Sequence, residues 1–205
     1  MVDNKKITLA VSMAIVTAIF AQLKFKIGPV PYTMQNLSVM LAGFILGPKY
    51  GAVSMLIYLS LIAIGLPVSS VGGGIAVLIG PTSGYLIGFV LSAYLAGIFR
   101  KLIWRKGSRV ELTLLWLSTL ISVIPTYLLG FIVFYEFAIG SSELANWVVD
   151  IASFFGFTSD SIPLLILFTS VLIFLPQDLF VDHLLAVLVF NYVSRMLKER
   201  GVRLD

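Results

Sequence analysis

The 205-residue sequence contains no cysteine, one histidine and few charged side chains. Without cysteine the chain forms no disulfide and offers no thiolate ligand to a metal. Charged residues make up 12% of the sequence, about half of what is usual in a soluble domain. Hydrophobic residues make up 59%, and the mean hydropathy is +1.04. This composition predicts a multi-pass protein of the cell membrane, built as one domain over residues 1–205.

Other missing features exclude several activities. The sequence has no Walker motif for ATP hydrolysis and no Gly-x-Ser-x-Gly turn for a nucleophilic serine. Metal binding would depend on Asp178, Asp182 and His183, but His183 lies about 100° around a helix from Asp182. The net charge is +4, yet the basic residues cluster between apolar runs, which indicates membrane topology and not nucleic-acid binding. We therefore expect no enzyme activity, no cofactor and no metal site in this chain.

The apolar runs predict an all-α fold with six transmembrane helices. The expected spans are residues 7–23, 37–46, 51–64, 81–99, 112–134 and 177–194. Pro125 is expected to kink the fifth of them. A further apolar piece, residues 162–175, is too short to cross a bilayer comfortably, so we expect a re-entrant or interfacial helix there.

Basic residues are distributed unequally between the two ends of these spans. Twelve of the fourteen Lys and Arg residues fall on the side of both termini, and Lys24 and Lys26 fall on the other. The positive-inside rule then places both termini in the cytoplasm. The interrupted segments 28–36 and 65–85 and the acidic segment 135–160 lie outside. Their convergence predicts an outward-facing pocket built from irregular loops.

Two carboxylates lie inside an apolar run near the C-terminus. An ionised side chain at the bilayer centre costs roughly 2.5–3.5 kcal/mol, so Asp178 and Asp182 must pair, meet water or bind a ligand. One interpretation places Asp178 in the first helical turn after Pro176, where the helix dipole stabilises a negative charge by about 0.3–1 kcal/mol. The other makes it an acceptor for N–H groups of a ligand. Asp182, one turn deeper, would extend the site or pair with another polar group.

Two interrupted segments supply candidates for the pocket wall. Prolines and a glycine break the helix pattern before residue 35, and irregular backbone at membrane depth is tolerated where it lines a cavity. Tyr32, Thr33, Gln35 and Asn36 are therefore candidate cavity residues, with an ordinary exposed loop as the alternative. Further along, Gly72–Gly74 allows close approach of the backbone to a ligand or a helix.

Small residues recur at every fourth position in the first span, at Ala10, Ala14 and Ala18. Such a stripe lets a second helix approach closely, since packing drives helix association in lipid. It fits packing within this chain and packing against a partner equally well. Glycines at the same spacing in residues 43–51 and 80–88 predict further close helix contacts.

Several of these motifs together resemble the BioY family, the biotin-specific substrate-binding (S) components of energy-coupling factor (ECF) transporters. The motifs are Pro29-Val-Pro-Tyr-Thr-Met-Gln35, Leu41-Ala-Gly43, Leu46-Gly-Pro-Lys-Tyr-Gly-Ala52, Ile64-Gly-Leu-Pro-Val68, Gly80-Pro-Thr-Ser-Gly-Tyr-Leu-Ile-Gly-Phe89 and Leu175-Pro176 with Asp178. The resemblance implies a six-helix protein that captures biotin from outside. It also implies a transmembrane coupling protein and two ATPases as partners, which alone use ATP, and a coupling contact through Ala10, Ala14 and Ala18.

The resemblance also implies a binding site. Asp178 would accept hydrogen bonds from the ureido N–H groups of biotin. The other expected contacts are polar or aromatic walls and a close-fitting loop, formed by Tyr32, Gln35, Tyr85, Gly73 and Gly74.

The chain departs from the family pattern at two positions. The family reads Pro-Gly-Asp-x-x-Lys at the last helix, and Val181 stands in place of that lysine. Gly72 stands where some members carry a polar residue. Both changes remove polar ligand contacts, so another vitamin-like ligand stays open as an alternative. The carboxylate tail of biotin then needs another donor, for which Gln177, Lys24 and Lys26 are the candidates.

Two functions of other classes also fit parts of the sequence. A self-sufficient channel or ion-coupled carrier would use Asp178 and Asp182 as proton or cation sites and would transport without partners. A membrane enzyme would depend on His183. An S component would bind its ligand alone but transport it only together with its partners.

Overall fold

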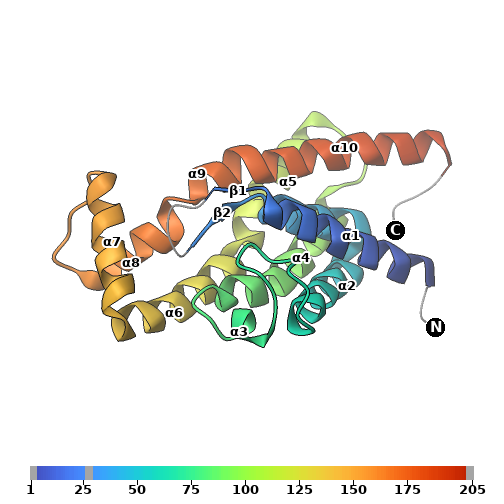
Figure 1. Cartoon of the computed structure of the whole chain (residues 1–205). Coiled ribbons are helices and arrows are strands. Elements are labelled where there is room, and N and C mark those ends of the chain that lie inside the picture. Colours follow the sequence, from blue (N-terminus) through green and yellow to red (C-terminus); the bar gives the residue numbers. More distant parts are fainter. Residues whose placement is uncertain (1–3, 26–29, 202–205) are drawn as a thin grey trace.

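Helices make up most of the computed structural model, which describes residues 4–25 and 30–201 (Figure 1). The α-helices are α1 (Asn4–Gln22), α2 (Gln35–Ala63), α3 (Ile75–Leu78), α4 (Ser83–Ile103), α5 (Arg109–Ser122), α6 (Ile124–Gly140), α7 (Ser142–Phe154), α8 (Ile162–Leu167), α9 (Leu175–Gln177) and α10 (Leu184–Glu199). Two stretches are π-helical, η1 (Phe168–Leu172) and η2 (Asp178–His183). A short antiparallel hairpin of β1 (Lys24–Phe25) and β2 (Tyr32–Thr33) follows α1.

Five stretches of the described chain are long and apolar enough to cross a membrane. They are Asn4–Gln22, Gln35–Ala63, Ser83–Ile103, Arg109–Gly140 and Ile162–Glu199. This count takes α2 as one stretch, but the second and third expected spans are its two halves, which fold back against each other: Gln35 Nε2 donates to the Tyr58 hydroxyl at 2.9 Å, and a Cβ atom at Gly51 would overlap the backbone of Gly43. The expected turn between them lies at Gly47, whose φ of 74° glycine adopts without steric cost, and Pro48 follows it.

The kink in α2 is stabilised from α4. Pro48 has no N–H, so the carbonyl of Phe44 loses the donor that a regular helix would supply. Arg100 of α4 is buried, and its Nε donates a hydrogen bond of 2.9 Å to that carbonyl. An arginine from a neighbouring helix thus replaces the missing amide.

Helix boundaries also differ from expectation in the C-terminal half. The fifth expected span is divided at Val123 into α5 and α6, and Pro125 lies in the first turn of α6. From Ile162 to Glu199 the helical elements follow one another with only a two-residue turn before Leu175. The apolar piece 162–175 therefore joins the last expected span in one stretch of 38 residues.

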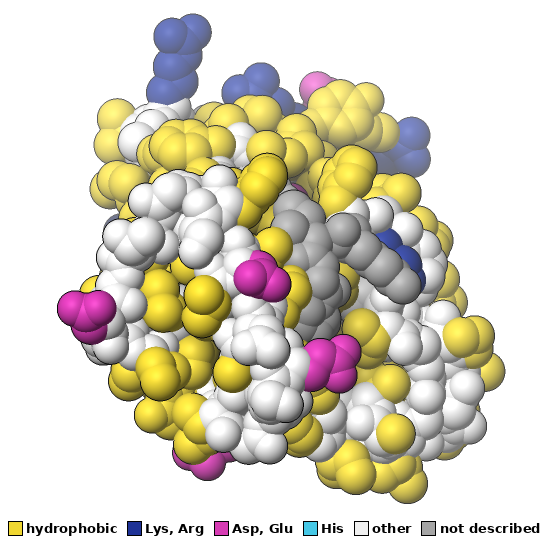
Figure 2. All heavy atoms as spheres, turned by 60° about the vertical axis from the view of Figure 1, so that its left-hand side comes forward, with side chains coloured by type: hydrophobic (Ala, Val, Ile, Leu, Met, Phe, Trp, Pro, Cys, Tyr) yellow, Lys and Arg dark blue, Asp and Glu magenta, His cyan; other side chains and the backbone are white. Residues whose placement is uncertain are grey.

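The two ends of the molecule differ in charge. The start of α1 and the end of α10 lie at the right-hand side of Figure 1, and α7 and α8 lie at the left. Figure 2 turns the left-hand side forward, and most charged side chains in its foreground are acidic. Glu136, Glu143, Asp150 and Asp160 are all exposed. The first and last helices thus begin and end on the side away from this acidic region, as the expected topology requires.

Close helix packing joins α2 to α4 through glycines. A Cβ atom at Gly97 would overlap the backbone of Gly47 and Pro48, and one at Gly43 would overlap the backbone of Ala93 and Gly97. Because lipid is as apolar as the helices, such close van der Waals contact is a main source of association within the bilayer.

We expect Gly97→Ala to lower the melting temperature of the detergent-purified protein. The added methyl group forces α4 away from the α2 kink, and overpacking of this kind costs about 1–3 kcal/mol. Gly140→Ala is the matched control, because a Cβ atom at Gly140 meets nothing within 4 Å. Equal melting temperatures for the two variants would contradict this packing.

Candidate functional site

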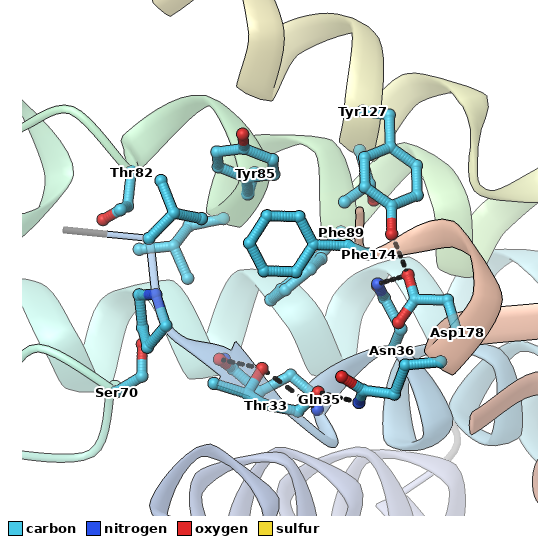
Figure 3. Close-up of a pocket in the computed structure, with 15 residues that line it drawn as sticks. Thr33, Gln35, Asn36, Ser70, Thr82, Tyr85, Phe89, Tyr127, Phe174 and Asp178 are labelled. Atoms are coloured by element: carbon cyan, nitrogen blue, oxygen red, sulfur yellow. Dashed lines mark hydrogen bonds between the residues drawn. The ribbon is translucent and has the colours of Figure 1, made fainter. Parts of the chain in front are cut away.

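A small cavity lies between the β-hairpin, the first turn of α2, α4, α6 and the segment around α9 (Figure 3). Its volume is about 70 Å³. It is lined by Val30, Pro31, Thr33, Gln35, Asn36, Ser70, Thr82, Tyr85, Leu86, Phe89, Thr126, Tyr127, Phe174, Gln177 and Asp178. Aromatic and aliphatic side chains with a few convergent polar groups are typical of a site for a small organic ligand.

Asp178 is the charged group of this cavity. It is the first residue of η2, and only 4% of its surface is exposed. Its Oδ2 accepts hydrogen bonds from Asn36 Nδ2, at 2.5 Å, and from the hydroxyl of Tyr127 (Figure 3). No hydrogen bond of the described residues reaches the other carboxylate oxygen of Asp178, Oδ1, and Asn36 Oδ1 is a buried acceptor without a partner. Two acceptor oxygens of cavity residues therefore lack a donor, and that of Asn36 is covered in this conformation.

A chain of hydrogen bonds holds the polar wall in place. Thr33 Oγ1 donates to Gln35 Oε1 at 3.1 Å, and Gln35 Nε2 donates to the Tyr58 hydroxyl at 2.9 Å. That hydroxyl donates to the Val68 carbonyl at 3.1 Å. Gln177 Nε2 donates to the Thr33 carbonyl at 3.1 Å, which connects the hairpin to α9. Gln35 thus positions the wall through both of its amide atoms.

Two tyrosine hydroxyls point away from the cavity into the irregular C-terminal helix. Tyr85 donates to the Ser170 carbonyl at 2.6 Å, and Tyr32 donates to the Ile173 carbonyl at 2.7 Å. Only the ring of Tyr85 is offered to a ligand. Tyr32 packs on Phe174 with ring centroids 4.2 Å apart and lies behind the cavity wall. Burial, and to a lesser extent the charge of Asp178, raises the pKa of Tyr32, so its hydroxyl remains a donor.

The structure brings together four of the seven residues predicted as substrate contacts, namely Gln35, Tyr85, Gln177 and Asp178. Tyr32 supports the wall without lining it. Gly73 and Gly74 do not line the cavity, which the same loop reaches through Ser70. A Cβ atom at Gly73 would overlap the Leu66 carbonyl, and Gly74 N donates to the Ile62 carbonyl at 2.7 Å. These two glycines let the loop fold back onto the end of α2, and they form no part of the cavity wall.

Three positions near the site that the sequence analysis singled out, Asp182, His183 and Val181, lie outside the cavity wall. Asp182 is fully buried, and its carboxylate accepts from Leu37 N and from Gln177 Nε2, both at 3.4 Å. It therefore satisfies an amide in the first turn of α2. His183 is 1% exposed and Val181 is 40% exposed, and neither lines the cavity.

The alanine stripe of α1 lies largely inside the chain. Ala10 and Ala14 have no exposed surface and belong to the hydrophobic core, and α1 packs against α2. Ala18 is partly buried. A partner has no access to Ala10 and Ala14 in this conformation.

Lys26, one of the three candidate donors to the carboxylate tail of the ligand, lies outside the described residues.

Several cavity residues were missed or undervalued by sequence reasoning. Tyr127 is the most important of them, because its hydroxyl donates a hydrogen bond to the carboxylate of Asp178. It lies in an apolar span, where a tyrosine has no distinguishing signal. Phe89 and Phe174 also lie in apolar runs, whereas Thr82 stands in the Gly80-Pro-Thr motif without a signal of its own, and Asn36 is predicted as a cavity residue but not as a ligand contact.

The fold and this site define an integral membrane protein whose apolar helices enclose a small-solute pocket around a buried carboxylate. The chain belongs to the BioY family, whose family model matches residues 1–199. The family indicated by the sequence motifs is thus confirmed.

Individual relatives agree with this membership. The chain is 35% identical to the biotin transporter BioY of Lactococcus lactis over 211 aligned residues, which cover 100% of this chain and 98% of the relative. It is 37% identical to a probable biotin transporter BioY of Pyrococcus horikoshii over 137 residues, 63% of this chain and 85% of the relative. The crystal structure of an S-component for biotin from an ECF-type ABC transporter matches with a TM-score of 0.69 and 29% identity, covering 95% of each chain.

We expect Tyr85→Phe to lower the melting temperature of the purified protein without ligand. The substitution leaves the carbonyl of the fully buried Ser170 without its donor, and an unsatisfied buried acceptor costs about 1–3 kcal/mol. Tyr94→Phe is the control, since Tyr94 is 43% exposed on the same helix. An unchanged melting temperature in Tyr85→Phe would show that this hydrogen bond contributes little.

Proposed function

We infer that this chain is the substrate-binding component of an ECF-type importer and captures biotin from the outside. The observation that carries the assignment is a pair of acceptors without a donor, Asp178 Oδ1 and Asn36 Oδ1, on two residues that line an aromatic-walled pocket. The ureido ring of biotin presents two N–H donors side by side, which match two acceptors. Hydrogen bonds to a charged acceptor contribute about 1.5–3 kcal/mol, so Asp178 supplies most of the specificity for this head group.

The other residues of the site have distinct roles in this proposal. Asn36 and Tyr127 hold the Asp178 carboxylate in position through Oδ2, so that Oδ1 stays directed to the ligand. The rings of Phe89 and Phe174 cover the apolar part of the ligand between the ends of the pocket. Gln35 keeps the hairpin in register with α2.

Ligand entry requires the loops around the pocket to separate. A volume of about 70 Å³ is well below the roughly 300–1,000 Å³ of pockets that enclose organic ligands. The contacts that close the pocket are few: Gln22 Nε2 donates to the Ser69 carbonyl at 3.2 Å and Lys24 Nζ to the Ser70 carbonyl at 2.5 Å. We propose that the hairpin and this loop move apart to admit biotin.

Transport itself depends on partners in this proposal. A transmembrane coupling protein and two ATPases supply the energy, and the chain is oriented with both termini in the cytoplasm. We propose that α1 meets the coupling protein on its outer side, near Ala18, because Ala10 and Ala14 are covered by the chain itself. Ile15 and Ile19, 51% and 58% exposed, give this side an apolar surface for a partner or lipid.

Biotin is expected to raise the melting temperature of the purified chain, because a ligand at 100 times its Kd stabilises the folded state by about 2.7 kcal/mol. Asp178→Asn is expected to weaken biotin binding about ten- to hundredfold in isothermal titration, since it removes the charge and turns one acceptor into a donor. Asp160→Asn, an exposed carboxylate far along the acidic segment, is the control. Stabilisation by another small vitamin and not by biotin would redirect the assignment to that ligand.

Uptake assays separate an S component from a self-sufficient carrier. Proteoliposomes that contain this chain alone are expected to bind biotin without accumulating it, whatever ion gradient is applied. Addition of the coupling protein and ATPases is expected to produce ATP-dependent uptake. Accumulation by the chain alone, abolished in Asp182→Asn, would instead support the ion-coupled carrier.

A further inference from the structure

We propose that Lys24 forms a second subsite of the pocket, which binds an anionic group at the far end of the ligand. For biotin, this group is the carboxylate of its tail, and to that extent the inference rests on the proposed function.

The hairpin directs Lys24 to the pocket. Lys24 and Thr33 are directly opposed in the β1–β2 pair, so their side chains lie on the same face of the hairpin. Thr33 lines the pocket. Lys24 Nζ lies 2.5 Å from the carbonyl oxygen of Ser70, which also lines the pocket. The ammonium group is thus held beside Ser70 of the pocket wall.

A second cavity lies beside the hairpin at Lys24, across the hydrogen bond between Gln177 and Thr33. Its volume is about 380 Å³, and it shares Thr33 and Gln177 with the pocket around Asp178. Its wall includes Gln22, Lys24 and Tyr32.

The two charged groups lie at opposite ends of the site. In Figure 3, Asp178 lies on one side of the aromatic rings of Phe89 and Phe174, and Ser70, the contact of Lys24, lies on the other. Among the described residues that line these two cavities, Lys24 carries the only positive charge. This arrangement fits an elongated ligand with N–H donors at one end and an anion at the other.

Lys24 is a better tail donor than its alternatives. The Nε2 group of Gln177 already donates to the Thr33 carbonyl and to Asp182. The ammonium group of Lys24 has three N–H donors, so it binds a carboxylate while it keeps its contact with Ser70. Val181 is 40% exposed and lies outside both cavity walls, so restoring a lysine there is not equivalent to Lys24.

The test compares biotin with biotin amide, whose tail is neutral, by isothermal titration of the detergent-purified full chain. Wild type is expected to bind biotin about five- to tenfold more tightly than the amide, the effect of one partly exposed ion pair. Lys24→Gln is expected to lose that preference by weakening biotin binding alone. Lys24→Arg is expected to keep the preference, and Lys106→Gln, in the exposed loop before α5, serves as the matched control.

The outcomes distinguish this inference from the proposed function. If Lys24→Gln keeps the preference for biotin, or weakens binding of both ligands equally, Lys24 is no anion subsite, and the assignment of biotin still stands. If wild type binds neither ligand, the proposed function fails and the inference fails with it. Loss of the preference in Lys24→Gln with an unchanged affinity for the amide supports the subsite.

Discussion

Every polar group that leaves regular helical hydrogen bonding inside this molecule must find another partner, because hydrocarbon offers none. In the described residues, side chains of neighbouring helices donate hydrogen bonds to backbone carbonyls at the places where helices are interrupted. Arg100 serves the carbonyl freed by Pro48, Tyr85 serves the π-helical segment η1, and Trp116 Nε1 donates to the Leu179 carbonyl of η2 at 2.9 Å. These bonds make the interrupted helices possible, and the interruptions create the pocket.

The same constraint supports our proposal that Asp178 binds the ligand. A buried carboxylate is stabilised only if several donors meet it, and here Asn36 and Tyr127 meet one oxygen. A structural carboxylate such as Asp182 has donors on both oxygens, from Leu37 N and Gln177. The two acids lie one turn apart, yet one is satisfied by the protein and the other is left half open. That difference separates the binding group from the supporting one.

The sequence predicted the features that the bilayer dictates. It did not predict the features that depend on contacts between residues far apart in the chain. Composition and hydropathy predicted the helical membrane fold, and the isolated charge of Asp178 marked the site. The Gly-Pro pair at Gly47 indicated the turn between two spans, but not that Arg100 of α4 donates to the carbonyl that Pro48 leaves free. Gly73 and Gly74 have the same local pattern whether they approach a ligand or their own backbone. Tyr127 gained its role only from the fold, which brings its hydroxyl to Asp178.

Opposite charges at the two ends of one site also determine ligand orientation. A ligand with an anionic tail that entered reversed would place its carboxylate beside the Asp178 carboxylate, and like charges in a dry pocket repel strongly. The same reversed ligand would leave Lys24 beside a neutral N–H donor. Correct orientation satisfies both ends and lets the hairpin and the loop at Ser70 close over the tail, since Lys24 contacts both. In our proposal, recognition of the tail and closure of the pocket are therefore one event at Lys24.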